Sequence, residues 1–312
     1  MRVLLAALLL AGCAPAGDTV ECVDDAPLVM LDDGAQALVL TARADGVEID
    51  TPRGVFVLFH GLGETACTWW DRAEGRRLTD MALAQDLVVV APDSGKRSWA
   101  TSWPENDDVD RVDGMLDALV DEGAIPGALP AAALGHSNGG AFAPIWAEST
   151  DWSTVAAINA NGWGTGALGA DASPPPLLFV RAVHDLVVPP GVTRAAAAEA
   201  ESNGHVVTSI RNTRQPISAD RLGRIRAIDR DQAAAVVDGL DAAGLLDGMR
   251  RLNANPRLDS RWRDALPDDV GEHTEAIEEQ LHVLYAEHRF TSDNALAIFD
   301  LVNAGIDAVA SP

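Results

Sequence analysis

Hydrophobic residues along this chain gather in short, uninterrupted runs that alternate with amphipathic stretches. Continuous apolar runs are typical of strands buried on both faces of a parallel sheet, and they occur at 54–59, 87–90, 154–158 and 177–180. Two weaker patterns, at 36–40 and 47–50, predict short strands beside Asp-Gly turns. The runs therefore predict a sheet whose central strands are covered on both sides.

Helical patterns separate these runs. In the stretch 109–119, apolar residues recur at spacings of three and four and form one stripe, with acidic residues opposite. An alanine-rich stretch at 191–201 follows two prolines, a pattern typical of a helix start. Because strands and helices alternate from about 54 to 203, we expect the α/β fold class, with an open, mostly parallel sheet and helices on both faces.

The pattern changes between about 211 and 280, where strand signals fade and helical signals dominate. A capping pattern begins at Ser218, and 233–246 and 272–287 predict further helices. A cap signal at 291–293 precedes an apolar-periodic C-terminal helix. We expect a core at 35–210, a helical insertion or lid at 211–280, and the C-terminal part of the core at 281–312.

The N-terminus resembles an export signal. Arg2 precedes an apolar run, 3–10, that is too short to span a bilayer. The run ends in Leu10-Ala11-Gly12-Cys13, which resembles a bacterial lipobox and makes Cys13 the expected lipidated residue. An ordinary signal peptide cleaved nearby is the alternative. We expect a signal peptide at 1–12, a flexible tether at 13–34, and an exported protein anchored by lipid at the periplasmic or extracellular face of the cell envelope.

Composition and charge exclude several classes of partner. The net charge of −24 comes from 47 acidic and 23 basic residues without a basic cluster that would attract phosphates, so we expect no nucleic-acid partner. We also expect neither metal nor cofactor, because the sequence has no metal-ligand spacing, phosphate-binding glycine loop or dinucleotide fingerprint. Membrane contact is expected only through the lipid anchor. Cys22 and Cys67 are left as a disulfide pair or as two free thiols.

The pentapeptide Gly135-His136-Ser137-Asn138-Gly139 fits Gly-x-Ser-x-Gly, the pattern of a nucleophile elbow. The pattern alone is a weak signal, because glycines and serines are common. Its context strengthens it, since a small-residue strand pattern at 131–134 precedes it and a helical pattern at 140–142 follows it. A strand-to-helix turn this tight exposes the serine hydroxyl at the carboxyl edge of the sheet. Ser137 is therefore the predicted nucleophile.

With this elbow the chain resembles the α/β-hydrolase superfamily, and within it the bacterial dienelactone-hydrolase-like and polyester-depolymerase-like esterases. The resemblance covers 53–203 and, more loosely, 281–312, whereas 211–280 departs from the minimal fold. Besides the elbow it is carried by His60-Gly61-Leu62-Gly63, by Ala91-Pro92-Asp93, by Asp185-Leu186-Val187-Val188-Pro189 and by the segment around His288.

The resemblance implies a Ser-His-Asp triad. The family's acid turn matches Asp185, with Asp171 as the alternative acid. The family's histidine precedes the last helix, which matches His288. Position alone separates it from the three other histidines that follow the acid turn, which are His205, His273 and His282.

The resemblance also implies an oxyanion hole, made by the backbone N–H groups of Leu62 and Asn138. Five tryptophans follow the ends of predicted strands, where open α/β sheets bind ligands. They predict either an aromatic-walled substrate cleft or ordinary loop packing, and they are Trp69, Trp70, Trp99, Trp103 and Trp163.

Together these features predict a serine hydrolase that cleaves carboxylic ester bonds through an acyl-enzyme on Ser137. The expected substrate is a small or polymeric ester with an apolar or aromatic group. The same triad also serves peptidases and thioesterases, which remain alternatives. A catalytically inactive envelope binding protein is another alternative, and it predicts a structure in which no histidine lies close to both Ser137 and Asp185.

Overall fold

The computed structural model describes residues 22, 26–31, 34–43, 46–102, 105–164 and 174–310. Within these residues the centre of the molecule is an eight-stranded sheet with the order β1-β2-β4-β3-β5-β6-β7-β8. Neighbouring strands from β4 through β3 to β8 are parallel, whereas β1 and β2 add to one edge in antiparallel orientation. The strands are β1 (Leu28–Met30), β2 (Gln36–Leu40), β3 (Gly54–Phe59), β4 (Leu87–Pro92), β5 (Ala131–His136), β6 (Thr154–Ala160), β7 (Leu177–Ala182) and β8 (Val207–Asn212).

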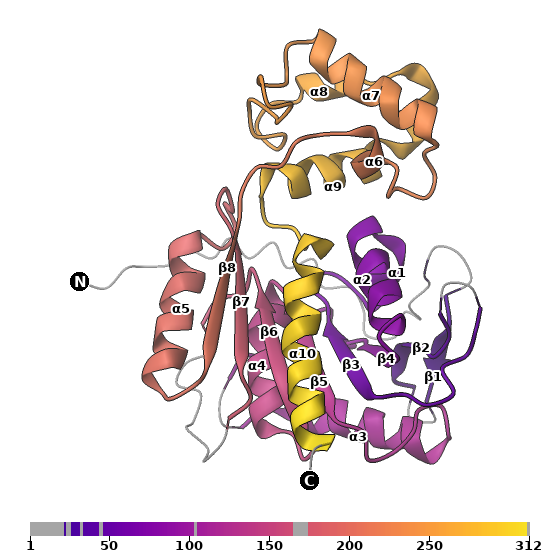
Figure 1. Ribbon diagram of the computed structural model, residues 1–312, viewed down its shortest axis with the longest axis vertical. Helices are drawn as coiled ribbons and strands as arrows, with labels where there is room; N and C mark the ends of the chain where they lie inside the picture. Colours follow the sequence, from indigo (N-terminus) through magenta and orange to yellow (C-terminus); the bar gives the residue numbers. More distant parts are fainter. Residues whose placement is uncertain are drawn as a thin grey trace.

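Helices cover both faces of this sheet (Figure 1). Alternate residues of the buried strands supply two cores, so that Val55 and Val57 pack toward one face whereas Phe56 and Leu58 pack toward the other. The predicted fold class, a mostly parallel α/β sheet with helices on both faces, is confirmed. The first face carries α3 (Asp107–Asp121), α4 (Asn138–Ser149) and α5 (Pro190–Ser202), and the second carries α2 (Ala73–Leu83) and α10 (Ala295–Ala310).

Residues 213–285 form a helical module, here called the cap, that lies beyond the carboxyl ends of the parallel strands (Figure 1). The cap has its own apolar core, which includes Val236, Trp262 and Leu281. The predicted insertion spans 211–280, whereas in the structure β8 includes residues 211 and 212 and α9 continues to Tyr285. Its elements are α6 (Ala219–Leu222), α7 (Arg230–Ala242), α8 (Arg261–Asp264), the 3-10 helix η1 (Asp268–His273) and α9 (Thr274–Tyr285).

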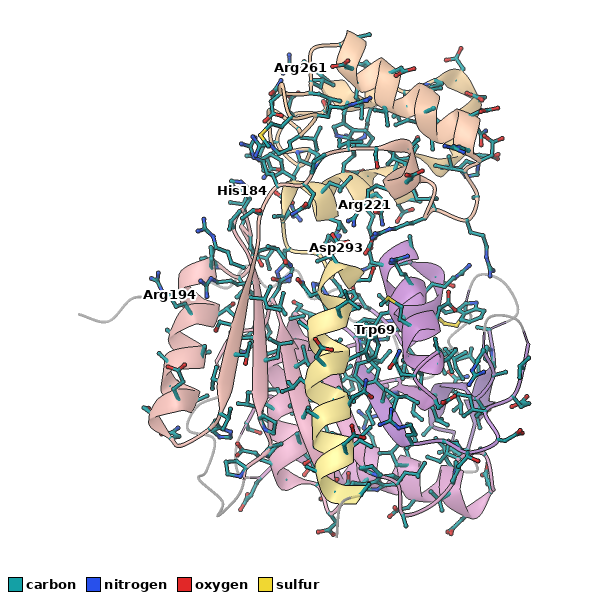
Figure 2. All side chains as sticks on the ribbon, in the orientation of Figure 1. Trp69, His184, Arg194, Arg221, Arg261 and Asp293 are labelled. Atoms are coloured by element: carbon teal, nitrogen blue, oxygen red, sulfur yellow. A yellow bond between two sulfur atoms is a disulfide. The ribbon has the colours of Figure 1, made fainter. Side chains whose placement is uncertain are left out.

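Ion pairs join the cap to the core near the start of α10. Glu74 of α2 is buried and accepts two bonds from Arg224 Nη1, at 2.9 and 3.0 Å. It also accepts the N–H and the hydroxyl of Ser292, at 2.8 and 2.6 Å. Arg221 pairs with Asp293, and Figure 2 shows these two residues at the junction between cap and core. The cap is therefore attached by buried polar contacts as well as by the chain itself.

The N-terminal region differs from the sequence prediction at two places. Residues 28–30 lie inside the predicted tether 13–34, yet they form β1 and pair with β2. Three residues are too few to show an alternating pattern, and they form a strand by pairing with β2, the next strand of the chain. Residues 47–50 do not form the predicted strand, because only Glu48 makes a bridge, to Ala42.

Cys22 and Cys67 form a disulfide, which settles the alternative that the sequence left open. Their Cα atoms are 5.0 Å apart and the bond ties residue 22 to the start of α1 (Thr68–Asp71). The expected signal peptide, Cys13, Trp103 and Asp171 lie outside the described residues. Among the residues that are described, no helix combines the length and the apolar character needed to cross a bilayer.

Candidate active site

Ser137 lies in the turn between β5 and α4. Its φ of 57° and ψ of −115° fall outside the regions that side-chain-bearing residues favour, so the turn is strained. A Cβ atom at Gly135 would lie 1.9 Å from the carbonyl oxygen of Gly139, and one at Gly139 would lie 2.3 Å from the carbonyl oxygen of Phe59. The two glycines of the motif are therefore required by close backbone approach, and the turn fixes Ser137 at the carboxyl edge of the sheet.

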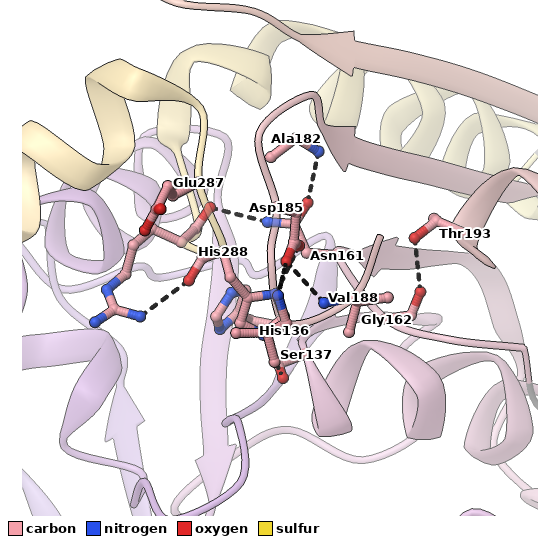
Figure 3. A network of polar contacts seen from close by, with 12 residues as sticks. His136, Ser137, Asn161, Gly162, Ala182, Asp185, Val188, Thr193, Glu287 and His288 are labelled. Atoms are coloured by element: carbon pink, nitrogen blue, oxygen red, sulfur yellow. Dashed lines mark hydrogen bonds and ion pairs between the residues drawn. The ribbon is translucent and has the colours of Figure 1, made fainter. Parts of the chain in front are cut away.

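His288 connects Ser137 to Asp185 (Figure 3). Its Nε2 lies 2.7 Å from Ser137 Oγ and its Nδ1 lies 2.6 Å from Asp185 Oδ2. Because a carboxylate only accepts hydrogen bonds, we place the ring proton on Nδ1, so that Nε2 accepts from the Ser137 hydroxyl. All three residues are buried. In this arrangement a histidine can remove the serine proton while the carboxylate stabilises the imidazolium that forms.

Asp185 is held by its own turn after β7. Its second carboxylate oxygen, Oδ1, accepts the backbone N–H groups of Val187 and Val188, at 2.8 and 2.7 Å. One oxygen is thus fixed by the backbone of the same turn and the other faces His288. The acid therefore keeps its orientation through contacts within five residues of sequence.

Residues of the core contact one side of the segment that contains His288. Ala286 ends α9 in the left-handed conformation, with φ of 61°, and its carbonyl accepts the N–H of His184 at 2.9 Å. Asn161, at the end of β6, donates from Nδ2 to the carbonyl of Arg289 at 2.9 Å. Its Oδ1 accepts an N–H from the end of β7 at 2.9 Å, so Asn161 links two strands to the histidine segment (Figure 3).

The cap holds the same segment from the other side, through Glu287. This carboxylate is buried, lies 2.6 Å from His282 Nδ1, and accepts from Arg257 Nε at 3.0 Å and from the Asn255 side chain. Burial opposes ionisation, but the bonds from His282, Asn255 and Arg257 prevail and lower the pKa of Glu287 to about 2. The residue before His288 is therefore a charged anchor in the cap.

The three alternative histidines lie against carboxylates elsewhere. His282 faces Glu287, as described above, and His205 Nε2 lies 2.6 Å from Glu148 Oε1. His273 lies at the end of η1 in the cap, 3.5 Å from Glu272. The structure thus brings His288 to both Ser137 and Asp185, which is the opposite of the arrangement predicted for an inactive binding protein.

The loop after β3 carries one of the two predicted oxyanion donors. The N–H of Gly61 donates to Glu64 Oε2 at 2.8 Å, and the N–H of Gly63 donates to the carbonyl of Arg97 at 2.7 Å. Leu62 lies between these two glycines, and its N–H takes part in neither bond. Glu64 therefore fixes the loop, and no backbone bond among the described residues uses the N–H of Leu62.

The second predicted donor is Asn138, the first residue of α4. The N–H groups of a first helical turn have no partner within the helix, so this one is free of the α4 ladder. The Asn138 side chain exchanges two bonds with the backbone of Trp99, at 2.6 and 3.0 Å. Trp99 Nε1 also donates to the carbonyl of His60 at 3.0 Å. Trp99 therefore joins the two sides of the predicted oxyanion hole.

Arg72 connects the oxyanion loop to the cap. Its Nη1 donates to Glu64 Oε1 at 2.5 Å, and its Nε lies 3.1 Å from Glu279 Oε2 on α9. Sequence reasoning missed this chain of contacts, and the signal for it was only an acidic residue three positions after Gly61. Acidic residues are frequent around the site, yet within the described ranges no group of three or more His, Cys, Asp or Glu residues is arranged to hold a metal.

Of the five tryptophans with two predicted roles, Trp69, Trp70, Trp99 and Trp163 are among the described residues. Trp69 and Trp99 are 2% and 3% exposed, and they pack edge-on against Phe290 and flat against Phe142. Trp70 is half-buried under the guanidinium of Arg76, and the carbonyl of Trp163 accepts from Asn159. For Trp69 and Trp99 the structure favours the packing role, because strand-end loops must themselves be packed.

No family model and no curated protein matches this sequence. Its structure is similar to that of a thermostable esterase, with a TM-score of 0.43, 21% identity, and coverage of 60% of this chain and 54% of that one. It is also similar to a puromycin-hydrolyzing peptidase of Mycobacterium tuberculosis, with a TM-score of 0.43, 19% identity, and coverage of 59% and 35%. An esterase of Pyrococcus furiosus gives a TM-score of 0.45 at 11% identity, with coverage of 60% and 82%. The chain thus spans 54% and 35% of the length of the first two.

Proposed function

We propose that this chain is a serine hydrolase that cleaves carboxylic ester bonds through an acyl-enzyme on Ser137. The observation that carries the proposal is the relay from Ser137 Oγ through both ring nitrogens of His288 to Asp185. The strained elbow and the two backbone N–H groups at Leu62 and Asn138 support it, because acyl transfer needs a nucleophile presented at the edge of the sheet and donors for the developing oxyanion.

The residues divide the reaction as follows. His288 Nε2 takes the proton of Ser137 as its oxygen attacks the ester carbonyl, and the N–H groups of Leu62 and Asn138 bind the oxyanion. The imidazolium, stabilised by Asp185, then protonates the leaving alcohol. Water then attacks the acyl-enzyme through the same steps, which releases the acid and regenerates Ser137.

The test is covalent labelling with a fluorophosphonate, followed by mapping of the modified residue, together with hydrolysis of p-nitrophenyl esters. We expect a label on Ser137 and ester turnover, and both are abolished in Ser137→Ala without loss of the folded state. Turnover that survives Ser137→Ala, or a label on another residue, would contradict the proposal. Thioester and amide substrates of the same acyl group separate esterase from thioesterase and peptidase activity.

An apolar acyl group is the substrate class that we propose. It is supported by exposed apolar side chains on the loops that flank the site, since Leu62 is 67% exposed and Leu186 and Val187 of the acid turn are 57% and 54% exposed. Leu186→Glu should weaken hydrolysis of long-chain esters and spare the acetate ester. Leu258→Glu, at a leucine in the cap that is 75% exposed, should change neither. Equal profiles for the two variants would argue against this substrate class.

We also propose export with lipidation at Cys13. The Cys22–Cys67 disulfide supports export, because disulfides persist in oxidising compartments. Metabolic labelling with palmitate should mark the wild-type chain and leave Cys13→Ala unlabelled. A labelled Cys13→Ala chain would contradict the anchor.

A further inference from the structure

A second histidine ring packs against the ring of His288. The hydrogen bonds that His288 makes to Ser137 and Asp185 join its two ring nitrogens and hold the ring in its own plane. The ring of His136 lies beside it, with 5.1 Å between the ring centroids and 41° between the ring planes (Figure 3). Aromatic pairs in contact have centroids about 4.5–7 Å apart, so the two rings touch.

His136 is fixed between the elbow and the oxyanion loop. It is the last residue of β5, directly before Ser137, and it is 4% exposed. The oxyanion loop packs against it, since a Cβ atom at Gly61 would lie 3.5 Å from His136 Nδ1. Glu64 Oε2 lies 3.9 Å from the same nitrogen and accepts the N–H of Gly61. His136 thus contacts both the loop that carries Leu62 and the proposed general base.

The His136 ring is neutral at pH 7, because burial lowers the pKa of His136 to about 4. Charged groups from the oxyanion loop, the start of α2 and α9 line a small cavity together with this ring, and they are Glu64, Arg72, Glu74 and Glu279. These groups are paired with one another or with Arg224. The neutral state matters because a positive charge on His136 would oppose a positive charge on His288.

A neutral aromatic ring stabilises a cation that lies against it. Its π electrons attract a positive charge within about 6 Å of the ring centroid, and the attraction is stronger where water is excluded. His288 becomes such a cation when it takes the proton of Ser137. The distance between the two rings is within this range, and His288 and His136 are 6% and 4% exposed. The pair is therefore arranged to stabilise the charged form of His288 more than its neutral form.

We propose that His136 is a positioning residue for the general base, which holds the ring of His288 in place and stabilises its imidazolium form in the transition states. The inference rests on the proposed serine hydrolase function. His136 exchanges no proton in this scheme. The proton of Ser137 moves to His288 Nε2 and from there to the leaving alcohol, while the neighbouring neutral ring lowers the energy of the charged form. Through Gly61 and Glu64 the same residue joins the base to the oxyanion loop.

The test compares an aromatic with an aliphatic replacement. His136→Phe keeps an aromatic ring, whereas His136→Leu fills much of the same space without π electrons. With a p-nitrophenyl ester we expect His136→Phe to stay within about twofold of the wild-type kcat, and His136→Leu to lose about tenfold in kcat with KM unchanged. A role in packing alone would affect both variants alike, because both side chains are apolar.

The pH profile of kcat/KM gives a second readout. When the charged ring of His288 loses a stabilising neighbour, it releases its proton at lower pH. In His136→Leu the acid side of the profile should therefore shift to lower pH by roughly one unit, since one unit corresponds to about a tenfold change in a protonation equilibrium. His136→Phe should keep the wild-type profile.

The matched control is His205→Leu. His205 is similarly buried, at 5% exposed, and it also lies against a carboxylate, with Nε2 2.6 Å from Glu148 Oε1. It precedes β8 and thus lies at the amino ends of the parallel strands, opposite to the edge that carries Ser137. His205→Leu should lose stability but keep the wild-type kcat and pH profile. His136→Met, which is also without an aromatic ring, replaces His136→Leu if that variant does not fold.

A wild-type kcat and pH profile in His136→Leu would overturn the inference. An equal loss of kcat in His136→Phe would also overturn it, because an aromatic ring would then not be what His288 requires. A change in KM alone, or the same shift of the profile in His205→Leu, would contradict a role in the chemical step. A wild-type chain that neither hydrolyses the ester nor takes the fluorophosphonate label would instead overturn the proposed function.

Discussion

The sheet and the cap contribute to the candidate active site in different ways. Ser137 and Asp185 are positioned by contacts close in sequence, namely a strained elbow and two amides of the same turn. His288 and the oxyanion loop are positioned in addition by side chains of the cap, through Glu287 in one case and through Arg72 and Glu279 in the other. One half of the site is thus encoded locally, and the other half depends on the docking of residues 213–285.

The largest effect is expected in the locally encoded half. Asp185→Asn keeps an oxygen that can accept the two amides but removes the charge that stabilises the His288 imidazolium. We expect kcat to fall roughly 10⁴-fold, as for loss of a triad carboxylate, with little change in the melting temperature. Steady-state kinetics with a p-nitrophenyl ester and a thermal melt check both expectations. A loss below tenfold would mean that the acid lies elsewhere.

This division also explains what the sequence alone could predict of the fold. The central strands are doubly buried, so each forms a continuous apolar run that is visible without any partner. β1 is three residues long and exists only because β2 lies beside it. Residues 47–50 have the alternation of a strand but make only one bridge to a neighbour. Both outcomes depend on whether a neighbouring segment pairs with the stretch, and the pattern within the stretch does not contain that information.

The same reasoning applies to the site. The elbow and the acid turn were identified because their chemistry requires particular residues at fixed spacing, and His288 followed from its position before the last helix. The contacts of Glu64, Arg72 and Glu279 join three segments that are distant in sequence. A carboxylate one position before His288 was visible in the sequence, but its partners in the cap were not.

Breaking the link between the cap and the oxyanion loop should have the next largest effect. Arg72→Met leaves two mostly buried carboxylates, Glu64 and Glu279, without their shared partner. We expect a loss on the order of 3 kcal/mol in unfolding free energy and about a hundredfold loss in kcat, because the loop that carries Leu62 loosens.

Urea unfolding and steady-state kinetics measure the two losses separately. The matched control is Arg261→Met, which breaks an exposed ion pair within the cap and should change neither quantity. If Arg72→Met loses stability but retains full kcat, the oxyanion loop does not depend on the cap.

Lowering the pH should reduce the stability that the two halves of the site contribute, in a separate pH range for each half. Burial lowers the pKa of His136 from its ordinary value of 6.5 to about 4, so between these values the unfolded chain binds more protons than the folded one. Stability therefore falls as the pH drops from 6.5 to 4, by roughly 3 kcal/mol from this group. In His136→Phe, the unfolding free energy should change less between pH 6.5 and 4, as measured by urea unfolding at a series of pH values. An unchanged slope would contradict the assigned neutral ring.

Glu287 acts in a lower window and on the cap side. Its pKa is lowered from 4.5 to about 2 by the bonds that overcome its burial, so the stability it contributes is present above pH 4.5 and is lost as the pH falls toward 2. Because the two windows barely overlap, mild acid should disturb the elbow while the anchor of His288 stays charged.

The smallest effect is expected from neutralising that anchor at pH 7. Glu287→Gln keeps the shape of the side chain but removes the charge that holds Arg257 and His282, so the His288 segment gains freedom. We expect kcat to fall about tenfold with KM unchanged, because a displaced general base affects the chemical step more than binding. Glu278→Gln is the matched control, since Glu278 also faces His282 but pairs with an exposed arginine and does not reach the His288 segment. If the two variants have equal kcat, His288 is positioned by the core alone, through Asn161 and the backbone bond to Ala286, and the cap would then act on the site only through Arg72.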